Sequence, residues 1–405
     1  MRIPFYLLAA LLLGSSCSRP DDEPQPTPTP PPPVSDPAAL IVVQTRHTTQ
    51  HPFTHRLTAY TPQGSVLWQR NDLYNATGHR YIYRNGIFFL GETNWDQASS
   101  TAAFRVRALR ATDGSPLWTL NNVQAQYAGL AASDSILYLA VIQGNATSLR
   151  AYHAQSGALR WQLPQPRSIA HLRFDNGTLY YVSFQPLNAG ATVVAFDPVA
   201  RQERWSAPLG SAVTNFVSGI RLSADAVYLT NAAGAVRAYD RATGALRWTG
   251  SAAFNDPHAM GNTVLVRGSQ GAVAGLDPAT GATRWTWQQS GGTPASTFSL
   301  ADGTVTFSEY VSQTQHYLTR LDAGTGTLRW RYPVPDAYME VVANGDRAYA
   351  LRTFISGSSA PPFGKIVFYD LANGRASDSV LINDQEIAQL SVVTASGAVL
   401  GSGGW

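Results

Sequence analysis

The chain has 405 residues, of which 44% are apolar and 14% charged, a globular composition that excludes an intrinsically disordered protein. Its net charge of +3 comes from scattered residues without a Lys/Arg cluster, which disfavours nucleic-acid binding. The 34 glycines and 25 prolines, with short runs rich in Val, Thr, Tyr, Trp and Phe, predict an all-β fold with many turns.

Residues 1–17 have the pattern of an export signal. An apolar run over residues 3–13 is followed by the small residues 14–16 and then by Cys17. The run is about half of the ~20 residues that a membrane-spanning helix needs. Cys17 is the only cysteine, so an intramolecular disulfide is excluded.

The segment before Cys17 resembles the lipobox of bacterial lipoproteins, although Gly14 stands where the lipobox usually has leucine. The resemblance implies that Cys17 is lipidated and becomes the mature N-terminus; the alternative is an ordinary cleaved signal peptide. Residues 18–37 are rich in proline and begin with an acidic stretch, which predicts an extended polyproline II spacer. We therefore expect an exported protein that a lipid holds to the cell envelope, at the outer membrane.

Tryptophans recur along the remaining sequence about 44 residues apart. In six of seven cases a glycine stands four positions before the Trp, and the best copies place an Asp four positions before that glycine, as in AYDRATGALRW (238–248). The seventh copy has Arg201 in the glycine place. A strand, an Asp/Gly turn and a returning strand predict a β-hairpin in which Asp bonds to backbone N–H groups and Gly takes a positive φ. The repeat tryptophans are Trp68, Trp118, Trp161, Trp205, Trp248, Trp285 and Trp330, and the repeat-turn residues are Asp197, Asp240, Asp277, Asp322, Asp370, Gly244, Gly281 and Gly326.

A second set of eight polar turns, such as Asn176-Gly177, alternates with the Trp-type hairpins. Two hairpins per repeat make a four-stranded antiparallel sheet, and sheets repeated in this way form a β-propeller. The count predicts a single propeller of eight blades over residues 38–405. Seven blades is the alternative, if the copy FYDLANGRASD (368–378), which has Asp378 in the Trp place, is not a blade.

The two ends of the chain are expected to share one blade, because the repeats begin with a Trp-type hairpin and end with the other type. Joining the first and last strands in one sheet closes the ring and removes exposed edges. The strand 40–44 is one more than a four-stranded sheet needs. Either this strand or the strand 398–401 fills the closing position.

The string Ala-x-Asp-x-x-Thr-Gly-x-x-x-Trp resembles the repeat of the pyrroloquinoline quinone (PQQ) propellers over nearly all of residues 40–401. The resemblance implies that the repeat tryptophans pack between adjacent blades. One branch of these propellers consists of dehydrogenases that hold PQQ and calcium over the axis, often against a vicinal disulfide. Another branch is non-enzymatic and includes the lipoprotein subunit of the outer-membrane β-barrel assembly machine, which is similar in size, lipid anchor and blade count.

Catalytic motifs are missing from the sequence. It contains no His-Glu-x-x-His, Gly-x-Ser-x-Gly, Cys-x-x-Cys or Walker-type loop, and its lone cysteine excludes a vicinal disulfide. A polar lining of the propeller axis is the remaining candidate site. The side chains expected to line it are His79, Tyr127, His171, His258 and Glu340.

The sequence thus predicts a monomeric, non-catalytic propeller that acts as a protein-binding or scaffold module for other envelope proteins. It is expected to bind no cofactor and no nucleic acid. The alternative is a quinoprotein-type dehydrogenase that binds PQQ with calcium at the axis. Fold alone does not decide between them.

Overall fold

The computed structural model separates the chain into the units Met1–Val34 and Ser35–Trp405. The first unit, with the predicted signal, Cys17 and most of the linker, lies outside the described residues. No helix among the described residues has the length and apolarity that crossing a membrane requires. The structure describes residues 38–47, 54–73, 80–96, 101–122, 126–143, 146–184, 190–209, 219–230, 234–251, 254–268, 271–288, 292–294, 296, 298–312, 314–335, 340–354, 363–382, 386–395 and 399–401.

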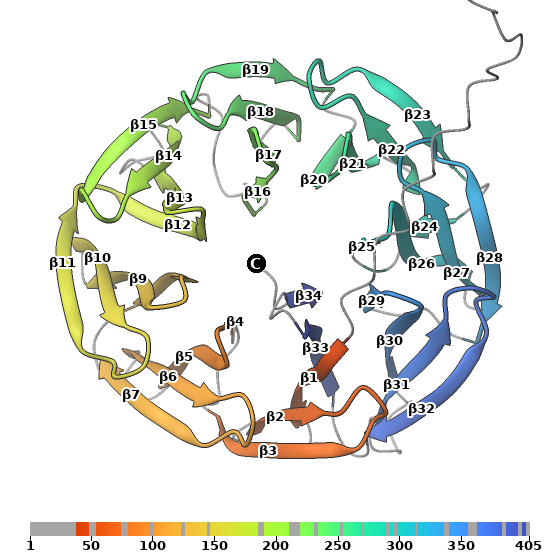
Figure 1. Cartoon of the computed structure of the whole chain (residues 1–405), viewed down its shortest axis with the longest axis horizontal. Coiled ribbons are helices and arrows are strands. Elements are labelled where there is room, and N and C mark those ends of the chain that lie inside the picture. Colours follow the sequence, from red (N-terminus) through yellow and green to blue (C-terminus); the bar gives the residue numbers. More distant parts are fainter. Residues whose placement is uncertain are drawn as a thin grey trace, which may run out of the picture. The chain divides into compact units, whose positions relative to one another are not determined.

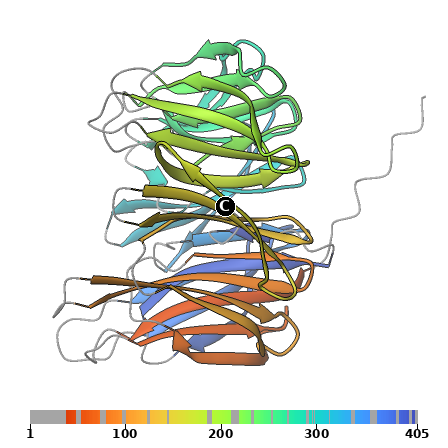
Figure 2. The ribbon, with the colours of Figure 1, turned by 90° about the vertical axis from the view of Figure 1, so that its left-hand side faces the viewer.

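The unit Ser35–Trp405 is a ring of eight antiparallel sheets, which we number as blades 1 to 8 (Figure 1). The predicted all-β propeller and its eight blades are confirmed, and the copy at 368–378 belongs to a true blade. In the view of Figure 2 the strands run between the two faces of the ring. Two sheets have five strands and not the expected four.

Within each blade the strands are ordered here from the propeller axis outward. Blade 1 has β34 (Val399–Gly401), β33 (Glu386–Thr394), β1 (Ala38–His47), β2 (Thr54–Tyr60) and β3 (Val66–Leu73). Blade 2 has β4 (Arg80–Arg84), β5 (Ile87–Asp96), β6 (Thr101–Arg110) and β7 (Pro116–Asn122). Blade 3 has β8 (Gln126–Ala132), β9 (Ile136–Gln143), β10 (Ala146–His153) and β11 (Leu159–Gln165). Blade 4 has β12 (Ser168–Asp175), β13 (Thr178–Phe184), β14 (Ala191–Asp197) and β15 (Gln202–Pro208).

The second half of the ring follows the same order. Blade 5 has β16 (Arg221–Leu222), β17 (Ala226–Thr230), β18 (Val236–Asp240) and β19 (Leu246–Thr249). Blade 6 has β20 (Phe254–Met260), β21 (Thr263–Gly268), β22 (Val273–Leu276) and β23 (Thr283–Trp287). Blade 7 has β24 (Thr293–Pro294) and β25 (Ser299–Ala301) on one edge of β26 (Thr304–Ser312), then β27 (Gln315–Asp322) and β28 (Leu328–Val334). Blade 8 has β29 (Glu340–Asn344), β30 (Arg347–Phe354), β31 (Phe363–Asp370) and β32 (Ala376–Ile382).

The core is divided into eight apolar clusters, one at each interface between neighbouring blades. Successive side chains of a strand point to opposite faces of its sheet, so the middle strands supply two clusters at once. In β1, Leu40 and Val42 pack toward blade 2, while Ile41 and Val43 pack toward blade 8. Burial on both faces explains why these strands are continuous apolar runs and not alternating ones.

The ring closes in blade 1, where β1 from the start of the chain pairs with β33 from its end. The ladder includes Ile41 opposite Val392 and Val43 opposite Leu390. The question left open by the sequence is settled, because β1 fills the closing position between β2 and β33. The strand β34 is an additional fifth strand on the axial side of β33.

The Trp-type hairpin has the same construction in blade after blade. Six of the seven repeat tryptophans lie opposite Ala or Gly on the neighbouring strand, as Trp248 does opposite Ala238, and this leaves room for the indole ring. The exception is Trp330, which lies opposite Arg320. In blade 6 the small residue is Gly275, where a Cβ atom would lie 2.3 Å from Trp285. Five repeat tryptophans donate their indole N–H to a turn carbonyl of the next blade; they are Trp68, Trp118, Trp205, Trp248 and Trp330.

The turn of the hairpin combines three interactions. One carboxylate oxygen of Asp240 accepts the backbone N–H groups of Ala242 and Thr243, and the other pairs with Arg247 at 2.7 Å. Asp197, Asp277 and Asp322 accept backbone N–H groups in the same way and pair with an arginine seven positions later, while Asp370 accepts the N–H of Ala372. Gly244 has a φ of +73°, and its Cβ position would lie 2.5 Å from the Trp205 ring of the preceding blade. Glycine is therefore required there both for backbone conformation and for close packing.

Replacing Gly244 should destabilise the propeller, both because its backbone has a positive φ and because a Cβ would clash with Trp205. Gly177 is a matched control, because its φ is +74° but no atom lies within 4 Å of its Cβ position. We expect Gly177→Ala to lose about 1–2 kcal/mol through its left-handed backbone. Gly244→Ala should lose a further ~1–3 kcal/mol by forcing Trp205 to move. Urea unfolding followed by circular dichroism measures both losses, and equal losses would contradict the packing role of Gly244.

Candidate functional site

The side chains predicted to line the axis differ in their placement. His171 and His258 lie on β12 and β20, the innermost strands of blades 4 and 6 (Figure 1). The Glu340 carboxylate is buried and accepts the backbone N–H of Leu390 in β33 at 2.7 Å, so it ties blade 8 to the closing blade. His79 lies outside the described residues, and for Tyr127 only the backbone, in β8, is described.

Several innermost strands are interrupted by bulges. The pairing register shifts between Ala170 and Arg173 in β12 and between Asn255 and His258 in β20. Within these shifts His171 and Asp256 adopt positive φ values of 54° and 49°. Such a conformation is uncommon outside glycine, and bulges re-aim the side chains beside them. The backbone N–H of Asp256 donates to the Thr230 hydroxyl of blade 5 at 3.2 Å, which holds this bulge in place.

Charged side chains gather at the axis around Asp256. Its carboxylate lies 3.2 Å from His258 Nε2, 3.6 Å from Arg267 Nε and 3.8 Å from Arg221 Nη2. Arg173 lies beside the same group, where its Nη1 donates to the Ile220 carbonyl at 3.3 Å and its charge acts on Arg221. We call Arg173, Arg221, Asp256, His258 and Arg267 the axial cluster. The sequence prediction included only His258 from this group.

The axial cluster departs from the repeat. Arg173, Arg221 and His258 occupy equivalent positions, each two residues before the residue that enters the inner-hairpin turn. Where the inner turn of another blade is described, the equivalent position holds a small or apolar residue. These residues are Ile82, Ala131, Ser299 and Val342. Aligning the residues before each inner turn was the sequence signal that could have singled out Arg173, Arg221 and His258.

The environment sets the protonation of the cluster. Burial acts to raise the pKa of Asp256, but hydrogen bonding with His258 and the charges of His258, Arg221 and Arg267 lower that pKa to about 2. Burial lowers the pKa of Arg221 to about 10 despite the attraction of Asp256. Burial likewise lowers the pKa of His258 below its usual value. At neutral pH the cluster therefore holds an ionised Asp, charged arginines and a neutral imidazole.

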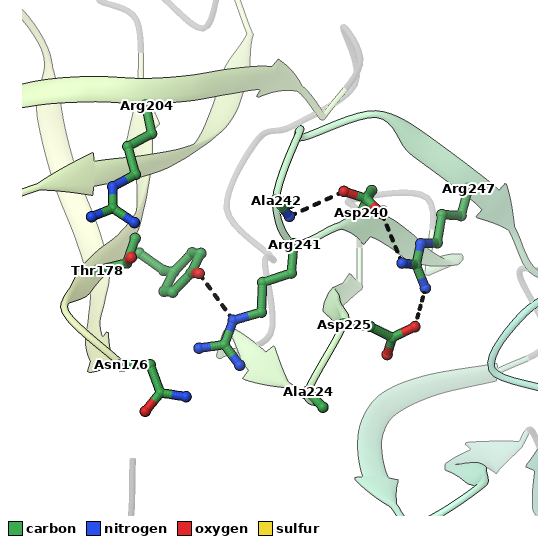
Figure 3. A pocket seen from close by; sticks show the side chains of 10 residues that line it. Asn176, Thr178, Arg204, Ala224, Asp225, Asp240, Arg241, Ala242 and Arg247 are labelled. Carbon is green, nitrogen blue, oxygen red and sulfur yellow. Dashed lines mark hydrogen bonds and ion pairs between the residues drawn. The ribbon is translucent and has the colours of Figure 1, made fainter. Parts of the chain in front are cut away.

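A polar pocket of about 430 Å³ lies between blades 4 and 5 (Figure 3). Arg241 forms its centre, where the guanidinium donates to Tyr180 Oη at 3.0 Å and to the Ser223 carbonyl at 2.7 Å and pairs with Asp175. Beside it Arg247 bridges Asp225 and Asp240. The pocket is lined by Asn176, Thr178, Tyr180, Arg204, Ala224, Asp225, Asp240, Arg241, Ala242 and Arg247.

Arg241 also departs from the repeat, because it follows the turn aspartate at a position that is small or apolar in the other blades. The equivalent residues are Thr61, Ala111, Ala154, Pro198, Pro278, Ala323 and Leu371. Four of them, Ala111, Ala154, Ala323 and Leu371, are buried between blades. In blade 5 the Arg241 guanidinium reaches back onto blade 4 instead, and this forms a hydrogen-bonding surface at the interface of these two blades. The sequence analysis missed this site.

Two buried glutamates are held by arginines within or beside their own blade. Glu92 of blade 2 pairs with Arg105 at 2.7 Å and with Arg107 at 2.9 Å. Glu309 of blade 7 pairs with Arg331 at 3.0 Å and accepts the Thr319 hydroxyl. Buried charges require such partners. In the described part of the chain, no three His, Cys, Asp or Glu side chains come together as metal ligands would.

Solved structures with the same architecture include BamB from Moraxella catarrhalis, with 14% identity, coverage of 76% of this chain and 87% of that chain, and a TM-score of 0.50. Dihydro-heme d1 dehydrogenase NirN in complex with DHE has 12% identity, coverage of 89% and 76%, and a TM-score of 0.60. Apo AztD from Citrobacter koseri has 12% identity, coverage of 90% and 99%, and a TM-score of 0.59. At these identities the likeness shows the fold alone.

Sequence comparison gives a more specific result. No curated protein matches the chain. One family model, described as outer membrane protein assembly factor BamB, matches residues 102–260 and 251–402, well over half of the chain. This match confirms the resemblance to the PQQ-like repeat propellers. The chain therefore belongs to the family of the outer membrane protein assembly factor BamB.

Proposed function

We propose that this protein is a non-catalytic scaffold of the bacterial cell envelope that binds another envelope protein through the pocket between blades 4 and 5. The lipid on Cys17 holds it to the outer membrane, and the proline-rich segment 18–37 spaces the propeller from the surface. A monomeric propeller suffices for this role. The family match supports an assembly function, since the family is described as an outer membrane assembly factor.

The pocket is the observation that carries the proposal. It is polar, lies at the turns of two blades and is created by Arg241, whose equivalents in the other blades are small or apolar. Rigid scaffolds commonly place recognition on their turns and loops. Its arginines and aspartates are already arranged in pairs, which suits recognition of a polar protein surface better than acid–base catalysis.

The carboxylates near the axis support a non-catalytic role. Asp256 is engaged by His258 and two arginines, and Glu340 by the Leu390 N–H. A dehydrogenase of the PQQ type would need carboxylates that bind calcium and accept a proton. These two side chains serve interactions within the protein instead.

Partner binding should depend on the pocket. Arg204 and Arg329 are matched repeat arginines, each paired with its turn aspartate, but only Arg204 lines the pocket. We expect the soluble chain starting at Ser18 to retain one envelope protein at near-stoichiometric yield from detergent-solubilised envelopes. Arg204→Ala should reduce that yield severalfold, because loss of a charged interfacial contact typically costs about 1–3 kcal/mol.

The control variant Arg329→Ala should retain the partner as the unchanged protein does. Circular dichroism melts of both variants establish that they are folded. If no envelope protein is retained, or if both variants lose it equally, the pocket is not the binding surface.

Cofactor binding provides a second test. We expect PQQ with Ca²⁺ to leave the melting temperature of the Ser18 form unchanged. Under the dehydrogenase alternative, ligand at a hundred times its Kd would stabilise the fold by about 2.7 kcal/mol. A thermal shift assay with and without Ca²⁺ distinguishes the scaffold from the dehydrogenase, and a clear rise in melting temperature on adding PQQ would favour the dehydrogenase.

A further inference from the structure

The pocket between blades 4 and 5 contains polar groups of blade 4 that the protein itself leaves unused. Thr178 and Tyr180 stand two positions apart in β13, so both side chains lie on the sheet face that packs toward blade 5. Both residues are almost fully buried, with exposures of 4% and 2%, and both line the pocket. Polar groups in such positions generally have hydrogen-bond partners.

The hydroxyl groups of Thr178 and Tyr180 are both available as donors. The Thr178 hydroxyl makes no hydrogen bond with the described residues. The Tyr180 Oη atom accepts the Arg241 Nε–H at 3.0 Å, but no described residue accepts the hydrogen of this hydroxyl. A ligand group in the pocket can therefore receive a hydrogen bond from each of them.

Two arginines beside these hydroxyl groups also keep spare N–H donors. Arg241 uses three of its five N–H groups, which donate to Tyr180 Oη, to the Ser223 carbonyl and to Asp175. Arg204 bonds to Asp197 through Nε and Nη2, so its Nη1 donates to no described residue. Figure 3 shows Arg204, Thr178 and Arg241 around one side of the pocket, away from Arg247.

The carboxylates that line the pocket have little capacity left to accept. Arg247 donates to one oxygen of Asp225 and one of Asp240. The other oxygen of Asp225 accepts the Ser223 hydroxyl at 3.0 Å, and that of Asp240 accepts backbone N–H groups. An ammonium, amide or hydroxyl group of a ligand would bring donors that find few free acceptors here. A carboxylate brings acceptors alone, with about four lone-pair sites.

The charges of the pocket are compatible with a carboxylate on the blade 4 side. Arg204 and Arg241 are each paired with one aspartate, Asp197 and Asp175, so each pair is neutral. The surplus negative charge is on the Arg247 side, where one arginine faces two aspartates. Asp225 there is 65% exposed, so water screens its repulsion of a ligand.

We propose that the pocket receives an acidic side chain, Asp or Glu, of the envelope protein that the propeller binds. Its carboxylate accepts hydrogen bonds from Thr178, Tyr180, Arg204 and Arg241. Charge-assisted bonds from guanidinium groups to carboxylates are among the strongest in proteins. The inference rests on the proposed function for the identity of the ligand as a protein, whereas the preference for a carboxylate has a test that needs no partner.

A small probe provides that test. The α-amide of N-acetyl-glutamic acid carries one side-chain carboxylate, and the α-amide of N-acetyl-glutamine is its uncharged counterpart. In methyl NMR spectra of the Ser18 form with labelled threonines, the glutamic acid compound should shift the Thr178 signal saturably. It should bind at least about fivefold more tightly than the glutamine compound, because charge-assisted hydrogen bonds are roughly twice as strong as neutral ones.

Thr263 is the internal control in the same spectra. Like Thr178 it begins the second strand of its blade and is 4% exposed, but it lies in blade 6 and does not line the pocket. Its signal should not move. The absence of a Thr178 shift, or equal affinities for the two compounds, would overturn the carboxylate site.

Two substitutions at position 178 connect this chemistry to the partner. Thr178→Asp places a negative charge on the pocket wall, and Thr178→Asn introduces an uncharged side chain of the same shape. Retention of the envelope protein should fall at least about tenfold further in Thr178→Asp, because the new carboxylate repels an acidic side chain and occupies the arginines. Thr263→Asp is the control and should leave retention unchanged, and circular dichroism melts establish that all three variants are folded.

The outcomes separate this inference from the proposed function. Equal losses in the two Thr178 variants would indicate an uncharged ligand group, and stronger retention by Thr178→Asp would indicate a basic one; either contradicts the inference. If the partner is retained through Arg204 but the glutamic acid compound does not bind, the carboxylate site alone is wrong. If this compound binds at Thr178 but the unchanged propeller retains no envelope protein, the proposed function is wrong and the carboxylate site stands.

Discussion

Burial of each sheet on both faces is the constraint on which this structure depends. A blade has no solvent-facing side of its own, because its middle strands contribute to two apolar clusters. Each blade is therefore stable only between two neighbours, and a row of blades must close on itself. The antiparallel pairing of β1 with β33 meets that requirement. Glu340 of blade 8 adds a hydrogen bond to β33 by accepting the backbone N–H of Leu390.

The contact between successive blades is carried by a few recurring residues. The repeat Trp lies over the glycine turn of the next blade and donates to a carbonyl of that turn, as Trp205 does to Arg241. Since the ring needs only this pattern, residues that break it without weakening the ring are candidates for function. Arg241 and the axial cluster are such residues, and both lie in blades 4 to 6.

The repeat made the fold predictable from the sequence. Trp, Asp and Gly at fixed spacing predicted the hairpin, and counting hairpins predicted eight blades and closure from both ends. The count could not place β34, because a hairpin pattern does not reveal which strand of the last pair joins β1. The repeat pattern also failed at position 378, where Asp stands in place of the Trp that would contact the glycine turn of the next blade. Val380 and Phe368 contact that glycine, Gly64 of blade 1, and the pattern did not predict this.

The candidate sites were less accessible to sequence reasoning. His258 could be assigned to an inner strand, but Asp256 joins it only because of a bulge that no local pattern predicted. Arg221 comes from another blade and Arg267 from the neighbouring strand, so their meeting depends on the closed ring. Glu340 was assigned to the axis from its strand, whereas its partner Leu390 lies 50 residues away in the chain.

Hydrogen exchange at the closing sheet tests the central claim most directly, namely that the ring has no weaker seam where its ends meet. The account predicts that the amides joining β1 to β33 exchange only through global unfolding, with the same free energy as amides joining β13 to β14 within blade 4. Exchange of the β1–β33 amides at a much lower free energy, while blade 4 stays protected, would show that the closing sheet opens locally and would contradict it.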